Sequence, residues 1–530
     1  MKTIKILKST ADTDSSEMIE KAINEASAES TVVFEKGTYF LSKPVCIKGK
    51  KELIIDGTGV VLAPFFDRSE GADTGSDVFH LSDCENITII GFTICSPVPV
   101  NSAGTIIDVT EEYADVEMTS SVPLTGNEQF IDGGTFDENR NPMNHYWVFG
   151  GYDEAKRTII AGEIPCTAPK KLDTPHEMIG DQTVRVFSKR LVALKPGMYC
   201  CISHSYYGLC AFVFRQCKGI IIEDVKITNF AGFGFLILPH CKDFVFRRVT
   251  FASADRIHQP LALNSDGIHI KGLSGSLVME GCEFDCIADD VLNVHTQVMT
   301  VTDVEDDKIK LVYNKIGGVV SPYWCEKEDK LRIYDPNTLV LKGKVAVLSS
   351  CGGDILTEHG AVEIRNGDLV TNDKYYPDVT IQNCNFYGCR TRTLCLQGTN
   401  SLTLQKCTFN NVSKKTIYCT TAFDHWQEAG PLCNVTIKDN VFYGTKGWYG
   451  AGSVIHVDVS GSKYQNISPL HKNISIVNNC FKNIAGRPIE IHLTDGVTVK
   501  NNVFENCVCN AEKILVEKSI NIVCSNNTSF

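Results

Sequence analysis

A short strand-like pattern recurs along most of this 530-residue chain. Its nine positions are any residue, apolar, any, apolar, two variable residues, small or polar, any, and finally Phe or Ile. Several neighbouring copies start 23 or 24 residues apart, and the others are separated by longer connections. A period of this length is typical of a solenoid, in which each unit buries its apolar face only against its neighbours. The pattern fits Asn86–Ile94, Gly219–Ile227, Asp243–Phe251, Ser276–Phe284, Asp378–Phe386, Ser401–Phe409, Asn434–Phe442, Asn473–Phe481 and Gly496–Phe504.

Alternation of apolar and polar residues within each copy favours strands over helices. The seventh position holds one residue type over runs of copies, Cys282, Cys384 and Cys407 and then Asn440, Asn479 and Asn502. Stacks of like side chains about 4.8 Å apart are what a parallel β-helix produces. A leucine-rich repeat would need a Leu-rich consensus and a helical segment per unit, which the pattern lacks. The sequence therefore predicts an all-β protein built on a right-handed parallel β-helix.

Three further segments modify this solenoid. Ser15 or Ser16 is suited to begin an amphipathic helix through about Ala26, which would cap the open end of the apolar stack. Two stretches with short strands but without the pattern predict small antiparallel β-barrels inserted into loops. The expected organisation is a cap and first coils (1–102), a barrel-like insertion (103–215), coils with an acidic site (216–296), a second barrel-like insertion (297–370) and C-terminal coils (371–530).

Composition limits the possible partners and compartment. The chain is 43% apolar, enough for a large core, and its net charge of −12 argues against nucleic acid or an anionic membrane as partner. No apolar run long enough to span a membrane and no apolar leader after Met1 are present, so we expect a cytoplasmic protein unless a leader was removed. The 23 cysteines include no Cys-x-x-Cys, and we interpret them as small buried hydrophobic residues. We expect neither a metal site nor a cofactor, and homo-oligomerisation stays open.

Two acidic motifs lie one repeat apart. Asp266, within Asn264-Ser265-Asp266-Gly267, precedes Asp289 by 23 residues, and Asp290 follows directly. If one coil separates them, the three carboxyl groups project from the same wall. Asp and Asn are also common turn formers, which would explain any one of them. Three together suit glycosidic bond hydrolysis, because neighbouring carboxylates raise the pKa of one that must act as an acid.

Other side chains join this candidate site by their position. His269, Asn293 and His295 lie close to the acidic motifs, as does Asn264. Applying the same offsets to later copies of the pattern leads to Arg390, Arg392 and Asp424. The last opens a segment with Trp426 and Glu428. An aromatic ring beside polar groups suits a sugar, whose ring has an apolar face and hydroxyl edges. Solvated arginines and a packing tryptophan are the simpler alternatives.

These residues resemble glycoside hydrolase family 110, the inverting α-1,3-galactosidases. The likeness rests on the segment 264–269, on Asp289-Asp290-Val291-Leu292-Asn293-Val294-His295, and on Trp426-x-Glu428-x-Gly430. It implies an exo-acting hydrolase of galactose-terminated oligosaccharides or glycoconjugates. By the same resemblance Asp289 would be the general acid, and Asp266 and Asp290 would hold and activate the attacking water.

Two other functions remain open from the sequence. A polygalacturonase-like or other polysaccharide hydrolase shares the Asn-x-Asp-Gly and Asp-Asp elements, but its Gly-His-Gly and Arg-x-Lys motifs are absent. A non-catalytic carbohydrate-binding β-helix would use the same wall without turnover. The carboxylate trio argues against the second of these.

Overall fold

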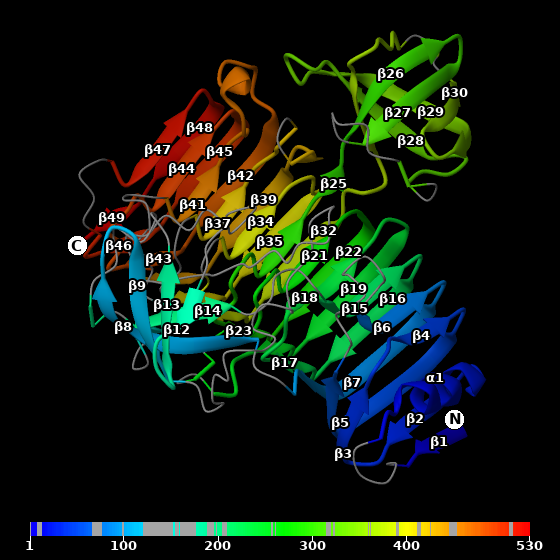
Figure 1. Ribbon diagram of the computed structural model, residues 1–530. Coiled ribbons are helices and arrows are strands. Elements are labelled where there is room, and N and C mark those ends of the chain that lie inside the picture. Colours follow the sequence, from blue (N-terminus) through cyan, green and yellow to red (C-terminus); the bar gives the residue numbers. More distant parts are fainter. Residues whose placement is uncertain are drawn as a thin grey trace.

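A computed structural model describes most of the chain. The described residues are 2–7, 13–65, 77–97, 100–119, 152–153, 158–159, 176–187, 196–197, 199–203, 209–255, 258–259, 261–313, 320–321, 324–358, 360, 362–387, 389, 392–410, 415–423, 426–444, 453–507 and 512–530. They form a right-handed parallel β-helix, as the repeat predicted (Figure 1).

Each typical coil contributes three strands, one to each of three parallel runs. Two runs merge into a 23-stranded sheet because β5 and β7 are long enough to belong to both. Its strands are β1 (Lys2–Ile6), β2 (Ser30–Phe34), β3 (Gly37–Leu41), β5 (Lys51–Pro64), β7 (Glu85–Cys95), β16 (Lys218–Glu223), β17 (Lys226–Thr228), β19 (Cys241–Arg247), β20 (Thr250–Phe251), β22 (Leu273–Glu280), β23 (Glu283–Asp285), β32 (Asp378–Gln382), β33 (Asn385–Tyr387), β35 (Ser401–Gln405), β36 (Thr408–Asn410), β39 (Cys433–Lys438), β40 (Val441–Tyr443), β42 (His471–Val477), β43 (Cys480–Lys482), β45 (Thr494–Lys500), β46 (Val503–Glu505), β48 (Ile520–Ser525) and β49 (Thr528–Ser529).

The third run is an eleven-stranded parallel sheet, which we call the site sheet because the acidic motifs border it. Its strands, in spatial order, are β4 (Val45–Lys48), β6 (Asp77–Ser82), β15 (Leu209–Arg215), β18 (Gly232–Ile237), β21 (Ile268–Ile270), β24 (Leu292–Val294), β34 (Leu394–Leu396), β37 (Ile417–Cys419), β41 (Ile455–Val457), β44 (Ile489–His492) and β47 (Ile514–Glu517).

The nine-residue pattern spans a corner between two strands of a coil. Its seventh residue is buried at the corner, where asparagines form a ladder: the backbone N–H groups of Asn440 and Asn479 each donate to the side-chain oxygen of the asparagine on the next coil, at 3.0 Å. The residue just before the corner takes a left-handed backbone, with φ near 57° at Asp439 and Asn478. Asp and Asn tolerate this conformation better than other side chains, which explains their frequency there.

The ninth position forms the core. Phe386, Phe409, Phe442 and Phe481 stack on successive coils, with ring centroids 4.6 to 4.8 Å apart. All four rings are completely buried. The stack holds neighbouring coils in register, and the register in turn decides which side chains become neighbours on the site sheet.

The predicted N-terminal cap is present as α1 (Ser16–Glu25), which buries Ile19 and Ile23. Ser15 occupies the N-cap position but makes no side-chain cap hydrogen bond. Asp14 takes that role instead, because its carboxylate accepts hydrogen bonds from the backbone N–H and the hydroxyl of Ser16. A short 3₁₀ turn, η2 (Ser462–Tyr464), interrupts a later connection.

The two insertions differ from each other. The second forms a closed antiparallel barrel of β26 (Met299–Glu305), β27 (Lys308–Tyr313), β30 (Asp354–Glu358), β29 (Leu341–Cys351), β28 (Lys330–Tyr334) and β31 (Leu369–Asn372), which stands beside the coils in Figure 1. The first was also predicted to be barrel-like. Its described residues form a five-stranded antiparallel sheet, with β12 and β14 at the two ends, and the prediction of a barrel stays a prediction. This sheet contains β12 (His176–Met178), β13 (Thr183–Phe187), β9 (Tyr113–Met118), β8 (Asn101–Val109) and β14 (Tyr199–Ser203), and a separate two-stranded ribbon contains β10 (Tyr152–Asp153) and β11 (Thr158–Ile159).

A second two-stranded ribbon lies at the base of the barrel. In it, β25 (Thr296–Gln297) pairs antiparallel with β38 (Glu428–Ala429). Because the barrel begins at Met299, this ribbon ties the barrel to the coil that carries Glu428. No helix among the described residues has the length and apolar character needed to cross a membrane.

Candidate functional site

The register of the site sheet brings the two acidic motifs together. His269 on β21 pairs with Asn293 on β24, a separation of 24 residues, and Gly267 N–H donates to the carbonyl oxygen of Asp290 at 2.8 Å. Asp266 is therefore level with Asp290. The repeat of 23 residues had placed it level with Asp289, and that prediction is wrong by one residue because the turns of this coil are one residue longer.

The three carboxyl groups nevertheless converge. One oxygen from each of Asp266, Asp289 and Asp290 lies within 4.8 Å of the others. Asp266 and Asp290 are buried, with 5% and 1% of their surface exposed, whereas Asp289 is only partly buried. The predicted convergence is thus observed, and the catalytic role of the trio stays a prediction. Asp289 is the member best placed to meet a ligand from solvent.

On the next coil, Arg392 occupies the register position that Asp266 and Asp290 hold on theirs. Leu292 pairs with Leu394, so the same register places Arg392 level with Asp290. Its Nε and Nη2 donate to the two carboxylate oxygens of Asp290 at 2.9 and 2.7 Å. A bidentate guanidinium–carboxylate pair is among the strongest polar contacts in proteins and fixes both side chains.

The electrostatics of the trio follow from burial and crowding. Burial raises the pKa of Asp266 well above its usual range, and the neighbouring Asp289 raises it further. Burial also raises the pKa of Asp290 to about 8, with Arg392 opposing the shift and the other two aspartates adding to it. Desolvation therefore outweighs the guanidinium, and the trio holds a proton near neutral pH. Because the groups are so close, the proton belongs to the cluster and not to one residue.

A close backbone approach explains the glycine of the first motif. A Cβ added to Gly267 would lie 2.6 Å from the carbonyl oxygen of Val291 and 2.8 Å from the ring of Phe251. Only a residue without a side chain fits there. Gly267 thus allows the two coils to pack tightly enough for Asp266 to reach Asp290.

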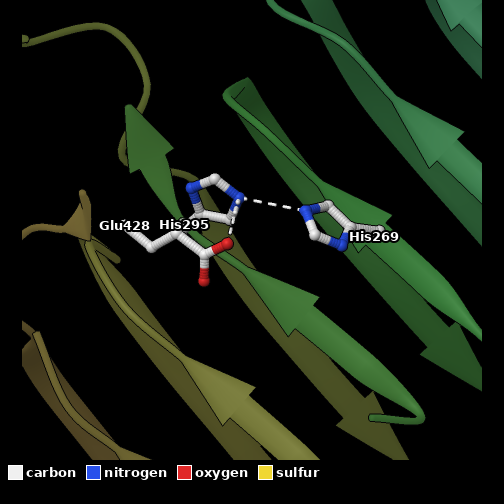
Figure 2. A group of neighbouring side chains, drawn as sticks. All are labelled: His269, His295 and Glu428. Carbon is white, nitrogen blue, oxygen red and sulfur yellow. Dashed lines mark hydrogen bonds and ion pairs between the residues drawn. The ribbon is translucent and has the colours of Figure 1, made fainter. Parts of the chain in front are cut away.

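A second polar group borders the trio: His269, His295 and Glu428, which we call the imidazole–carboxylate group. Figure 2 shows the two rings meeting through their Nε2 atoms, with the carboxylate beside His295. The Nε2 atoms are 3.1 Å apart, and His295 Nε2 is 3.6 Å from Glu428 Oε1. His269 Nδ1 lies 2.6 Å from Asp266 Oδ2, which links this group to the trio.

At neutral pH the two imidazole rings of this group are neutral and Glu428 is charged. Burial lowers the pKa of both His269 and His295 to about 4, so both rings are neutral. Burial acts to raise the pKa of Glu428, but His295, His269 and a hydrogen bond from Asn293 outweigh it, so its pKa is lowered and it is a carboxylate.

The other predicted site residues differ in how exposed they are and in what they contact. Asn264 is fully buried and its Oδ1 accepts a hydrogen bond from Gly232 N–H at 2.6 Å, so it supports the wall and cannot meet a sugar in this structure. Asn293 donates to Glu428 Oε2 at 3.4 Å. Trp426 is 61% exposed, which excludes simple packing in the core. Arg390 and Asp424 lie outside the described residues.

The sequence interpretation missed Gln397. Its Nε2 donates to Glu428 Oε2 at 3.3 Å, and its Oε1 accepts from Ala422 N–H at 3.2 Å. It follows β34 as His295 follows β24, in the same register. A pattern fitted to the site sheet would have found it, but the nine-residue pattern follows the other two runs.

Comparison with known proteins gives a β-helix family model and several α-1,3-galactosidases as relatives. The model of the family described as "Right handed beta helix region" matches residues 357–504. Alpha-1,3-galactosidase B of Bacteroides thetaiotaomicron is 22% identical over 93% of this chain and 82% of its own length. Alpha-1,3-galactosidase A of Shewanella woodyi is 22% identical over 90% of this chain and 78% of its own. Alpha-1,3-galactosidase A of Peterkaempfera griseoplana is 24% identical over 55% of this chain and 43% of its own.

Among solved structures, an exopolygalacturonase from Thermotoga maritima covers 99% of this chain and 91% of its own, with a TM-score of 0.44 and 11% identity. Several of the related galactosidases are considerably longer than the region they share with this chain, which spans about half of them.

Proposed function

We propose that this chain, which is related to α-1,3-galactosidases over 93% of its length and is consistent with glycoside hydrolase family 110, is an exo-acting hydrolase that releases terminal α-1,3-linked galactose with inversion. The observation that carries the proposal is the convergence of Asp266, Asp289 and Asp290 within 4.8 Å on one wall. The substrate class is a galactose-terminated oligosaccharide or glycoconjugate.

The burial of the trio supports a division of roles. Asp289, the partly exposed member, donates a proton to the glycosidic oxygen as the bond from that oxygen to the anomeric carbon breaks. A water molecule held by Asp266 and Asp290 forms the new bond to the anomeric carbon, and its proton passes to Asp290. A pKa of about 8 suits a base that must work near neutral pH. Arg392 keeps the Asp290 carboxylate oriented throughout.

The imidazole–carboxylate group and Trp426 supply candidate sugar contacts. Glu428 and Asn293 present polar atoms next to the trio, and the exposed Trp426 lies two residues before Glu428. An exposed indole can cover the apolar face of galactose while polar groups bind its hydroxyls.

The spacing of the carboxyl groups makes stereochemistry the decisive test. Inverting pairs usually stand about 6.5–9.5 Å apart and retaining pairs about 5–5.5 Å. One oxygen of each carboxyl group lies within 4.8 Å of the others, and the proposal of inversion rests on the family resemblance and on the presence of two carboxylates beside the acid.

An NMR time course of galactose-α-1,3-galactose hydrolysis tests the proposal directly. We expect β-galactose to appear first and α-galactose only later through mutarotation. The fucosylated B trisaccharide and a pectin fragment, run in parallel, report the acceptor preference and the polygalacturonase alternative. Initial release of α-galactose would contradict inversion, and hydrolysis of the pectin fragment alone would contradict the galactosidase.

A further inference from the structure

The imidazole–carboxylate group has the composition of a metal site. We propose that Nε2 of His269, Nε2 of His295 and a carboxylate oxygen of Glu428 bind a divalent transition-metal ion, of which Zn²⁺ is the best match. Two histidines and one carboxylate are a ligand set that Zn²⁺ uses when it keeps one coordination position open. This inference stands on its own geometry and does not depend on the galactosidase proposal.

The Nδ1 atoms of both rings face oxygen atoms, which turns their Nε2 atoms toward each other. His269 Nδ1 lies 2.6 Å from Asp266 Oδ2, and His295 Nδ1 lies 3.3 Å from the carbonyl oxygen of Thr296. In the tautomer in which each Nδ1–H donates to its oxygen, with Asp266 as a carboxylate and the proton of the trio on another member, the neutral rings point bare Nε2 lone pairs at one another and at the Glu428 carboxylate. Three acceptors facing each other repel unless a cation, or a single shared proton, lies between them.

The distances within the imidazole–carboxylate group are close to those between two ligands of one metal ion. Two ligands bound at about 2.0–2.1 Å stand about 3.3–3.4 Å apart on a tetrahedral ion and about 2.9 Å apart at a right angle. The two Nε2 atoms are 3.1 Å apart, and the edge from His295 Nε2 to Glu428 Oε1 is 3.6 Å. These two edges are within a few tenths of an ångström of the spacing that an ion requires, and the third, from His269 Nε2 to the Glu428 carboxylate, is within 4.8 Å.

Neighbouring polar groups hold all three side chains in place. Metal-bound histidines usually donate their other N–H to a carboxylate or a carbonyl, which fixes the tautomer and the ring orientation. Asp266 and the carbonyl of Thr296 occupy those places here. Glu428 is held in the same way, because Asn293 and Gln397 both donate to its Oε2 and leave Oε1 facing the rings.

A fourth acceptor lies close by. Asn293 is 4% exposed, and its Oδ1 has no hydrogen-bond partner among the described residues. Buried oxygens without a partner are rare in folded proteins and call for an explanation. The Nδ2 atom of the same side chain donates to Glu428, so this oxygen belongs to a side chain in contact with the imidazole–carboxylate group and is a further acceptor there.

The aspartate trio is the alternative binding site for an ion, since one oxygen of each residue also lies within 4.8 Å of the others. Arg392, however, already occupies both oxygens of Asp290 with a positive charge. A divalent cation would have to displace or tolerate that guanidinium, which Coulomb repulsion opposes. No cation side chain bonds directly to the imidazole–carboxylate group among the described contacts.

Cobalt titration of the chelator-stripped, full-length protein tests the site without any substrate. Co²⁺ reports its own coordination through visible absorption, and calorimetry with Zn²⁺ gives the stoichiometry. We expect one ion per chain and ligand-field bands typical of mixed nitrogen and oxygen ligands. His295→Ala and the near-isosteric Glu428→Gln should each weaken binding by about 100-fold or more. Asp266→Asn, which alters the partner of His269 Nδ1 but removes none of the three proposed ligands, should weaken it by about 10–100-fold with the stoichiometry unchanged.

Two matched variants separate this site from the alternatives. His456 is a similarly buried histidine on the same sheet that contacts Asp458, so His456→Ala should leave the cobalt spectrum unchanged. Asp290→Asn should also leave it unchanged. The proposal is overturned if the folded wild-type protein binds neither ion below about millimolar concentration. It is equally overturned if binding survives both His295→Ala and Glu428→Gln, or is lost in Asp290→Asn.

Discussion

Arg392 and Asp290 form a bidentate ion pair across two neighbouring coils, with hydrogen bonds of 2.9 and 2.7 Å. Asp290 is 1% exposed and borders Asp266 and Asp289. The pair therefore places one positive charge against three crowded carboxyl groups. It opposes the rise that burial gives to the pKa of Asp290 and so tunes the affinity of the cluster for protons.

Removing this pair should shift the pH dependence of activity. Arg392 lowers the pKa of Asp290, so Arg392→Ala should raise that pKa further above about 8 and reduce the deprotonated fraction of the proposed base at neutral pH. We expect the acidic limb of the kcat/KM profile to move to higher pH, with activity at pH 7 falling about tenfold for each unit of the shift. Arg392→Lys, which retains the charge but not the bidentate geometry, should shift the limb less. Identical profiles for the wild type and both variants would contradict the proposed role of Asp290.

Asp289→Asn should remove the proposed acid. We expect kcat for galactose-α-1,3-galactose to fall by about 10²–10⁴-fold, because an amide cannot protonate the leaving oxygen. A dinitrophenyl galactoside needs no such proton, so its hydrolysis should fall much less. The exposed barrel substitution Asp303→Asn serves as the control and should leave both rates within about twofold. Equal losses for the two substrates in Asp289→Asn would argue against an acid at this position.

Asp290 should also affect stability in a pH-dependent way. Its pKa is raised from about 3.9 in the unfolded chain to about 8 in the folded one, so the folded state binds the proton more tightly. The stability that this proton contributes is complete below pH 4 and is lost as the pH rises through about 8. We expect Tm to fall more between pH 5 and pH 8.5 for the wild type than for Asp290→Asn, measured calorimetrically. A larger fall in the variant would show that the sign is wrong.

Gly267→Ala should damage both fold and site. The new Cβ would lie 2.6 Å from the carbonyl oxygen of Val291, which belongs to backbone and cannot rotate away. We expect unfolding to become easier by about 1–3 kcal/mol, together with a loss of activity as Asp266 moves from Asp290. Gly180→Ala, whose nearest atom is a threonine hydroxyl at 3.3 Å, should change stability by less than about 0.5 kcal/mol. Wild-type stability in Gly267→Ala would disprove the tight approach.

The sequence alone determined the solenoid, because its period, its corner asparagines and its stacked phenylalanines are local signals repeated many times. The ladder from Asn440 to Asn502 and the stack of Phe386, Phe409 and Phe442 are direct consequences of that repetition. It also predicted that Asp266, Asp289 and Asp290 would meet, because one coil separates the two motifs.

Only the tertiary structure decided which side chains are level with one another. Coils differ in length by single residues, so a period of 23 could not show that Asp266 aligns with Asp290 or that Gln397 reaches Glu428. The offsets of the repeat had assigned Glu428 to the same site as His295, but they could not show that these two residues, 133 positions apart, are direct neighbours joined by the ribbon of β25 and β38. A repeat predicts which residues are neighbours on successive coils. Contacts made through connections of irregular length have no period, so only the folded structure shows them.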